Sequence, residues 1–335
     1  MAENLDRRNF FKRTLAASAG LTLAHSFEER ALLAASREPV STSAMPLPRG
    51  RIKDVEISRL FCGGNLTSGF AHSRDLIYVS NLLNHYFTDD KIFETWRLCE
   101  ESGINTAILR MDNKVLRLIN KYWHEVGGEI QWICQIKITE DDLTSEAMRA
   151  IDNGAVGVYI HGGVGDRLVA AGKSEIMGET LRVIKENGAI AGIAGHALAV
   201  PMAVEKAGLD PDFYMKTLNS ANYWTAGPRL PQDPDWRPTP QRPVEPEYGP
   251  DDHDNIWSCT PEQTIEFMKK VEKPWIAYKV LGAGAIEPRE GFEYAYANGA
   301  DFLCVGMFDF QIQEDVQIAH NVLNAPLQRD RAWRS

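Results

Sequence analysis

Short apolar runs alternate with longer segments of helical periodicity from Ser58 onward. The runs are continuously apolar, which is typical of strands in a parallel sheet that is covered on both faces. They read RLFCGG, INTAIL, IQWICQIKI, VGVYIHG, AIAGIAG, FYMKTL, PWIAYKVLG and DFLCVGM. Each run is followed by a longer segment in which apolar residues recur every three or four positions, as in a helix. Examples are segments 92–101, 115–126, 143–151, 176–185 and 265–271. Eight such units predict an α/β fold of the closed (β/α)8 class, a TIM barrel.

The barrel is expected to occupy residues 52–324 as a single domain, because no shift in composition marks a second one. An open, doubly wound sheet is the alternative fold, but no Gly-x-Gly-x-x-Gly motif opens a helix after an early strand. Residues 222–257 are rich in proline and lack periodicity, and residues 325–335 form a C-terminal tail. A loop of this length is usually functional or disordered, and its aromatic side chains favour function. These are Tyr223, Trp224, Trp236, Tyr248 and Trp257.

The first residues carry the pattern of an export signal. Arg7 and Arg8 precede two phenylalanines, a lysine and a short apolar run that is too short to span a bilayer. This pattern resembles the twin-arginine signal, which the export machinery reads as an address. We therefore expect a signal and cleavage region at 1–35, a linker at 36–51, and a mature protein that is periplasmic or extracellular.

The overall charge and the cysteines exclude several classes of protein. The formal net charge is −10, which argues against nucleic acid or an anionic membrane as a partner. The chain has five cysteines and no Cys-x-x-Cys spacing. Four of them lie in apolar strand or helix segments, so we interpret them as packing residues rather than metal ligands. These are Cys62, Cys99, Cys134 and Cys304.

Polar residues follow every predicted strand. In a barrel of this class the carboxyl ends of the strands converge on one face, where active sites form. The residues at these ends are Asn65, Arg110, Asp112, Lys137, His161, His196, Lys216, Asn219, Asn222, Lys279 and Asp309. A pocket for a small polar molecule explains them best, because a barrel interior disfavours unpaired charge. A structural ion-pair network involving Arg110 or Lys137 is the alternative.

The stretch GVYIHGGVGD, residues 157–166, places His161 at the end of a buried strand. The two glycines that follow predict a loop closed by Asp166. The expected pocket is mostly positive, so Asp112 and Asp166 at its rim are expected to balance the charge.

Several segments resemble the aldo/keto reductases, a family of NADP-dependent oxidoreductases with a TIM-barrel fold. VEISRLFCGGN is similar to the entry of their first barrel strand, GIN to the start of the second, and ICQIK and VYIHG to the strands that carry the family's lysine and histidine. AYKVLGAGAI is similar to the end of the seventh strand, and CVGMFDFQIQEDV to the eighth strand and the helix beside the cofactor. The resemblance spans most of residues 52–324.

The resemblance implies a catalytic tetrad of Asp, Tyr, Lys and His. Lys137 and His161 match the family's lysine and histidine and are the expected catalytic residues. The family's aspartate falls on Ile108, however, and its tyrosine falls on or beside Asn113. The chain is therefore a divergent member of this pattern, because the general acid of the tetrad is missing.

The resemblance also implies a nicotinamide cofactor. Gly282, Gly284, Gly306 and Glu314 match the cofactor-binding segments. No Lys or Arg follows Gly306 to bind a 2′-phosphate, and Asp309 stands there instead, so its charge disfavours NADP. NAD stays open, and the identity of any cofactor is unknown at this point.

The leading hypothesis is an exported barrel protein, related to aldo/keto reductases but with a degenerate tetrad, that binds or transforms a small sugar-like molecule. Three alternatives stay open. One is an NAD-dependent oxidoreductase in which Tyr159, Tyr223 or Tyr278 replaces the missing proton donor. Another is a binding or scaffold protein without catalysis. The last is a metal-dependent sugar hydrolase or isomerase that uses His161 and His196, although the sequence holds no spaced metal motif.

Overall fold

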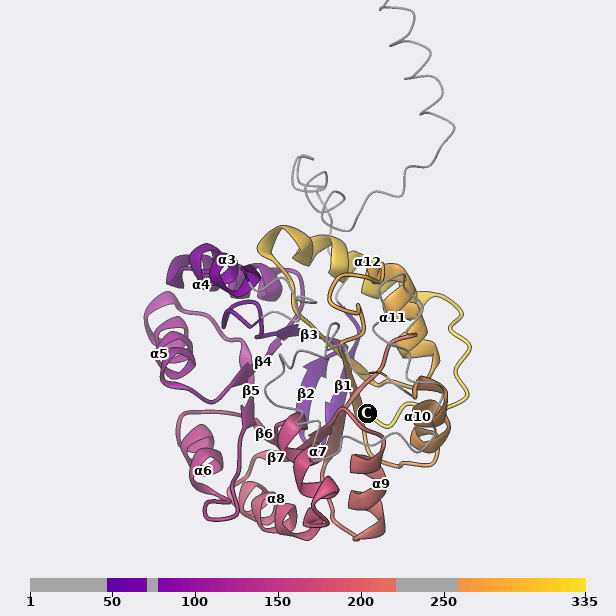
Figure 1. Ribbon diagram of the computed structural model, residues 1–335. Coiled ribbons are helices and arrows are strands. Elements are labelled where there is room, and N and C mark those ends of the chain that lie inside the picture. The colour runs from indigo at the N-terminus through magenta and orange to yellow at the C-terminus, as the bar shows by residue number, and fades with distance from the viewer. Residues whose placement is uncertain (1–46, 71–77, 221–257, 259) are drawn as a thin grey trace, which may run out of the picture. The chain divides into compact units, whose positions relative to one another are not determined.

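The structure is a computed structural model, and it describes residues 47–70, 78–220, 258 and 260–335 (Figure 1). Within these residues, eight parallel strands close into a barrel in the order β10-β3-β4-β5-β6-β7-β8-β9. They are β3 (Leu60–Gly63), β4 (Thr106–Arg110), β5 (Gln131–Ile136), β6 (Gly157–Ile160), β7 (Ile190–Gly195), β8 (Phe213–Thr217), β9 (Trp275–Tyr278) and β10 (Phe302–Val305). Each predicted apolar run overlaps one of these strands, so the (β/α)8 fold is confirmed. The expected signal region, most of the expected linker and the loop 222–257, with Asn222 and Tyr223, lie outside the described residues.

Helices surround the barrel on all sides (Figure 1). They are α3 (Val79–Tyr86), α4 (Asp89–Glu101), α5 (Asn113–Lys121), α6 (Ser145–Asp152), α7 (Gly162–Ala170), α8 (Met177–Glu186), α9 (Ala199–Lys206), α10 (Pro261–Met268), α11 (Pro288–Ala297) and α12 (Ile312–Asn324). The hydroxyl of Thr88 and the carboxylate of Asp112 cap α4 and α5 by accepting from backbone N–H groups. A proline at the first position begins α10 and α11.

The segment after His161 differs from the prediction. A loop was expected between His161 and Asp166, and this expectation is wrong, because α7 begins at Gly162. The His161 ring caps this helix, since its Nδ1 accepts from the backbone N–H of Gly163 at 3.1 Å. Glycine also lets α7 approach β7 closely: a Cβ atom at Gly165 would lie 2.3 Å from the carbonyl oxygen of Ala194.

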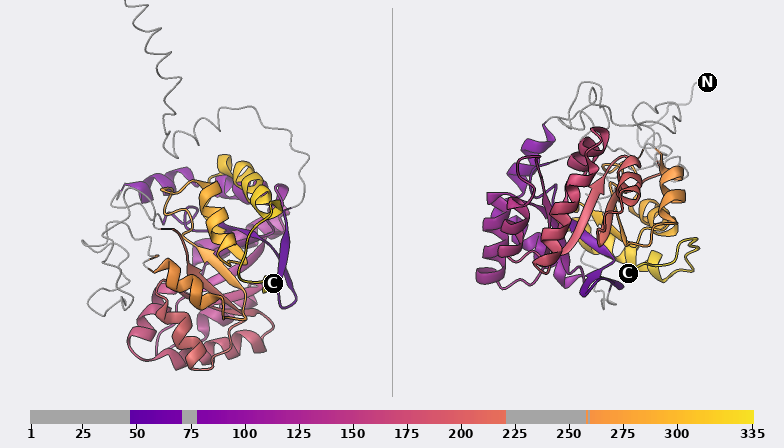
Figure 2. Two further views of the ribbon diagram at one scale, coloured as in Figure 1. Left: turned by 90° about the vertical axis from the view of Figure 1, so that its right-hand side faces the viewer. Right: turned by 90° about the horizontal axis from the view of Figure 1, so that it is seen from below.

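The barrel interior is filled by side chains and closed at the amino ends of its strands by a hairpin. Strands β1 (Arg49–Ile52) and β2 (Val55–Ser58) pair antiparallel, and Ile52 and Ile57 join the interior cluster. The side chains of Asn105 and Gln131 donate to the carbonyl of Glu56, which holds the hairpin in place. Figure 2 shows the hairpin at one end of the barrel, beside the C-terminus.

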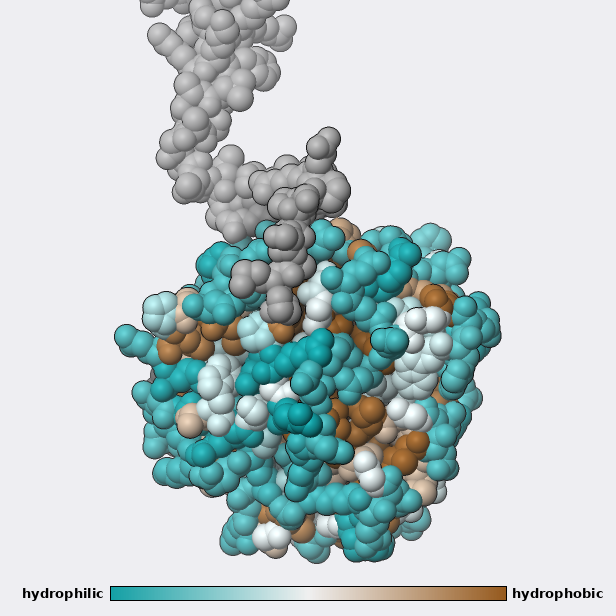
Figure 3. Space-filling view, turned by 180° about the vertical axis from the view of Figure 1, so that it is seen from behind, coloured by the Kyte–Doolittle hydropathy of each residue, from teal (hydrophilic) through white to brown (hydrophobic). Residues whose placement is uncertain are grey.

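A second and larger cluster fills the space between the strands and the helices. Cys62, Cys99 and Cys134 are buried as free thiols, and Cys304 is a half-buried free thiol, as the packing interpretation predicts. Burial raises the pKa of the Cys134 thiol well above its ordinary value, so this thiol is kept unreactive. Seen from behind, the coloured part of the surface is mostly hydrophilic, with hydrophobic groups between the polar side chains (Figure 3). Among the helices in the described ranges, none is long and apolar enough to cross a membrane.

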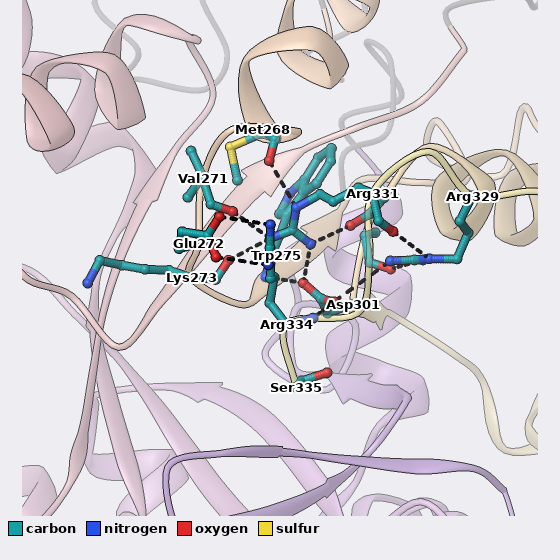
Figure 4. A network of polar contacts seen from close by, with 12 residues as sticks. Met268, Val271, Glu272, Lys273, Trp275, Asp301, Arg329, Arg331, Arg334 and Ser335 are labelled. Carbon is teal, nitrogen blue, oxygen red and sulfur yellow. Dashed lines mark hydrogen bonds and ion pairs between the residues drawn. The ribbon is translucent and has the colours of Figure 1, made fainter.

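The segment 325–335 packs against the barrel through a buried ion pair. Arg331 Nη1 donates to Asp301 Oδ2 at 2.6 Å, and the two side chains are 1% and 0% exposed (Figure 4). The remaining Arg331 donors bind backbone carbonyls of Met268, Gly299, Val271 and Lys273. The Asp301 carboxylate also accepts from the backbone N–H of Trp275 and of Arg334. This network joins the last residues to the strand β10 and to the turn before β9.

Candidate functional site

Four neighbouring strands bring the polar residues of the candidate site together. β6, β7, β8 and β9 are consecutive in the barrel, and they end just before His161, before His196, at Thr217 and at Tyr278. Tyr159 and Ala194 belong to the interior cluster, so the alternation of a strand directs the residues two positions later towards the barrel axis. These two residues are His161 and His196, which are both buried.

The central contact of the site joins His196 to Asp166. His196 Nδ1 lies 2.7 Å from Asp166 Oδ2. The same carboxylate accepts from the backbone N–H groups of His196 and Ala197 at 3.0 to 3.1 Å. Asp166 is 1% exposed, so the expectation that it stands at the rim is wrong. It lies beneath the turn after β7 because α7 carries it there.

Burial raises the pKa of Asp166 to about 7. The backbone N–H groups of Ala197 and His196 and the positive charges of Lys216 and His161 oppose this rise. When the carboxylate is ionised, it accepts a hydrogen bond from the Nδ1–H group of the His196 ring, and the neutral ring then has its basic nitrogen at Nε2. The raised pKa means that Asp166 changes its protonation state near neutral pH.

Lys216 places a buried positive charge beside this pair. Its Nζ donates to the carbonyl and to the hydroxyl of Thr217, at 3.0 and 2.8 Å. The hydroxyl of Thr217 in turn donates to the carbonyl of His196 at 3.0 Å. Lys216 is 2% exposed, and it links the end of β8 to the end of β7. Its charge acts on Asp166 from inside the protein, where solvent screens it weakly.

Tyr278 lies against the His196 ring. The two ring centroids are 5.5 Å apart with an interplanar angle of 62°. Gly162 makes this arrangement possible: a Cβ atom at this position would lie 2.6 Å from the Tyr278 hydroxyl and 2.9 Å from His196 Cε1. Of the other tyrosines considered as proton donors, Tyr159 is buried in the barrel interior with its hydroxyl bound to the Gln135 side chain.

The remaining predicted residues lie in three different surroundings. Arg110 pairs with Asp112 at 3.1 Å and lies over the ring of Phe70 at 4.4 Å. Lys137 is exposed at the end of β5. Asn219 binds the hydroxyl of Ser258 through its backbone N–H, and its amide donates to the carbonyl of Lys279. Lys279 has a positive φ of 59°, so Asn219 stabilises an unusual backbone turn after β9.

The residues expected to bind a cofactor lie on the loops after β9 and β10 and in the first turn of α12. Gly282 and Gly284 have φ values of 53° and 80°, as a tight turn of left-handed residues requires. Gly306 and Glu314 are exposed. The carboxylate of Asp309 binds the Tyr86 hydroxyl at 2.5 Å and the Lys91 ammonium at 3.0 Å. Because Asp309 already engages this cation, these residues do not fit the 2′-phosphate of NADP.

The metal alternative receives no support from the part of the chain that the structure describes. No group of three His, Cys, Asp or Glu side chains in these residues could hold a metal ion. Nδ1 of His161 is used to cap α7, and Nδ1 of His196 faces Asp166.

Sequence reasoning missed the positions of Asp166 and Tyr278 relative to His196. The available signal was the pattern His-Gly-Gly-x-Gly-Asp, residues 161–166, in which glycines allow a helix to pack close to a strand. Nothing in the sequence near Tyr278 points to His196, because these residues come from different strands.

Comparison with known proteins supports the fold. No protein-family model matches the chain, and no curated protein matches it. The solved structure of PA4992 from Pseudomonas aeruginosa, described as an aldo-keto reductase, is 16% identical and superposes with a TM-score of 0.55. The alignment covers 85% of this chain and 100% of that one. At this identity the likeness establishes a TIM barrel similar to that of an aldo-keto reductase, and the fold alone.

Two further solved structures are more distant. Gox0644 is 12% identical, with 87% of this chain and 98% of that chain aligned at a TM-score of 0.48. A protein of Coccidioides immitis described as a deoxyribose-phosphate aldolase is 14% identical, with 90% and 99% aligned at a TM-score of 0.41. Neither enters the functional argument.

Proposed function

We propose that this chain is an exported barrel protein with a degenerate aldo/keto reductase tetrad that binds and transforms a small sugar-like molecule. The observation that carries the proposal is the contact of His196 with Asp166 at the carboxyl ends of the strands, with Lys216 and Tyr278 beside it. A histidine oriented by a buried carboxylate is a common proton-transfer device in enzymes. Packing alone does not require so many ionisable groups in one buried place.

The contacts of Ile108 and Asn113, which stand where the resemblance implies the aspartate and the tyrosine, support a degenerate tetrad. Ile108 packs in the apolar interior of the barrel. Asn113 begins α5, and its side-chain oxygen accepts from Arg149 at 2.6 Å. Neither residue can donate a proton to a carbonyl group, so any proton donor must come from elsewhere in the chain.

A sugar-like ligand agrees with the chemistry of the rim. The hydroxyl groups of a sugar need both donors and acceptors, which the half-buried Arg110 and Asp112 side chains offer, and its apolar faces pack on aromatic rings such as Phe70. The sequence of 222–257 adds further aromatic residues, and the proposed export would bring the protein into contact with extracellular sugars.

Calorimetric titration of the mature chain with D-glucose, D-fructose, D-xylose and D-glucuronate tests the proposal. We expect at least one sugar to bind. His161→Asn keeps a side chain that can cap α7 and removes the imidazole, so it is expected to weaken binding about tenfold while the fold is retained. Absence of binding by the whole panel would contradict the proposal.

A second candidate is an NAD-dependent oxidoreductase, and the observation that favours it is the position of Tyr278 beside His196. Fluorescence titration with NADH separates the two candidates. Saturable binding of NADH supports the second, whereas NADPH consumption with a general aldehyde is expected to be absent because Asp309 and Lys91 neutralise each other.

A further inference from the structure

Tyr278 and His196 converge on one point in front of Gly162. The phenol oxygen lies 2.6 Å from the Cβ position that Gly162 lacks, and His196 Cε1 lies 2.9 Å from it. The phenol comes from the end of β9 and the imidazole from the turn after β7. The phenol is a weak acid that can donate a proton, and the neutral imidazole is a base that can accept one. A proton donor and a proton acceptor therefore lie close together.

Asp166 gives the imidazole a defined direction of proton transfer. Its carboxylate oxygen lies 2.7 Å from Nδ1 of His196, and two backbone N–H groups hold the same carboxylate in place. With Nδ1 carrying the proton, Nε2 is the ring atom that accepts one. Asp166 is thus a positioning residue for His196, and Lys216 supplies the charge that favours the ionised carboxylate.

We propose that Tyr278 and His196 are the acid and base of an enolisation, and that the substrate class is an α-hydroxycarbonyl sugar. This inference rests on the function proposed above and names its chemistry. Tyr278 takes the place of the missing proton donor, although it comes from a different strand from the one that the resemblance implies.

The reaction balances without a co-reactant. His196 Nε2 takes the proton from the carbon beside the carbonyl, and the C–H electron pair forms the C=C bond of an enediol. The carbonyl oxygen takes the phenol proton of Tyr278, which leaves a phenolate. In the second step the other hydroxyl returns its proton to the phenolate and becomes the new carbonyl, while the former carbonyl carbon takes the proton from His196. The net result is an aldose–ketose isomerisation.

Exchange in D2O of the hydrogen on the carbon beside the carbonyl, which is C2 of an aldose and C1 of a ketose, tests this step directly by NMR. The full mature chain is incubated with those panel sugars that bind it, and wild type is compared with Tyr278→Phe. We expect exchange in wild type, and about a 100-fold or greater loss of the exchange rate in the variant, with a Kd that changes by less than about threefold. Tyr214→Phe is the matched control, because its hydroxyl binds Glu205 on the helix side of β8.

The outcomes distinguish a failure of the enolisation from a failure of the proposed sugar binding. A sugar that binds without exchange in wild type, or with equal exchange in Tyr278→Phe, overturns the enolisation and leaves sugar binding intact. Binding by no sugar of the panel overturns the proposed function and the enolisation together. Should Tyr278→Phe fail to fold, Gly162→Ala separates the phenol from the imidazole and is expected to abolish exchange in the same way; exchange at the wild-type rate in that folded variant overturns the enolisation.

Discussion

His196 Nδ1 lies 2.7 Å from the carboxylate of Asp166, a residue 30 positions earlier in the chain. The contact exists because α7 begins directly after β6 and carries Asp166 beneath the turn that follows β7. The pair is buried, which raises the pKa of Asp166 to about 7. The carboxylate fixes the orientation of the His196 ring, and several of the predictions below depend on this contact and on the packing around it.

Asp166→Asn is expected to reverse the tautomer of His196. The amide of asparagine offers an N–H group to the ring, so Nδ1 becomes the acceptor and the proton moves to Nε2. Nitrogen-15 NMR of the His196 ring distinguishes the two forms. We also expect the free energy of unfolding to fall by about 1–3 kcal/mol, because buried N–H groups lose a charged acceptor. Asp142→Asn, at an exposed turn, is the control and should change stability by less than about 0.5 kcal/mol.

Gly162→Ala is expected to disturb the site by overpacking. The new methyl group would lie 2.6 Å from the Tyr278 hydroxyl, so Tyr278 or His196 must move, at a cost of about 1–3 kcal/mol in the free energy of unfolding. Urea denaturation measures this cost. Gly178→Ala is the matched control, because its Cβ would meet only Leu209 at 3.1 Å and it lies within α8. A Gly162→Ala variant as stable as wild type would contradict the packing described here.

Asp315→Asn is expected to increase stability at alkaline pH. Asp315 is 3% exposed on α12, and burial, with a smaller contribution from the Glu314 charge, raises its pKa from 3.8 to about 8. The folded protein therefore binds this proton more tightly than the unfolded chain, and wild type loses stability as pH rises from about 4 to about 8. The neutral amide removes this loss. Thermal unfolding should show the variant more stable by on the order of 2–5 kcal/mol at pH 8.5, and nearly equal to wild type at pH 4. Equal stability at both values would show that Asp315 is not a buried acid.

Arg331→Leu is expected to destabilise the fold strongly. The substitution leaves the Asp301 carboxylate buried without its main partner and removes donors from several carbonyls (Figure 4). Breaking a buried pair in this way costs about 3–5 kcal/mol. Arg182→Leu breaks exposed pairs with Glu179 and Glu186 and should cost less than about 1 kcal/mol. Comparable losses in the two variants would mean that the segment 325–335 contributes little to stability.

Replacement of Arg7 and Arg8 by lysines is expected to leave the protein in the cytoplasm. The export machinery reads the arginine pair as an address, and lysine lacks the planar guanidinium group. Cell fractionation followed by immunoblotting measures the distribution. Unchanged export would show that the arginine pair is incidental.

The alternation of apolar runs and helical segments was sufficient to predict the barrel. Each run, from RLFCGG to DFLCVGM, overlaps an observed strand, because strands that are buried on both faces are mostly apolar. The carboxyl-end rule also predicts His161 and His196 as candidate site residues. The prediction of a loop after His161 was wrong. Glycine lowers helix propensity, so its presence favoured a loop. In the structure the glycines are part of α7, where the absence of a side chain allows the helix to approach the backbone of β7.

By itself the sequence determined the succession of strands and helices along the chain, the packing role of the cysteines and the set of polar residues expected at the strand ends, because these depend on local patterns of residues. Only the tertiary structure decided which of those residues meet. Tyr278 reaches His196 because their strands are two positions apart in a closed barrel, and Asp166 reaches it because α7 packs against β7. Such contacts depend on the distances and directions between side chains on separate strands and helices. A pattern of residues along the sequence specifies neither the distances nor the directions.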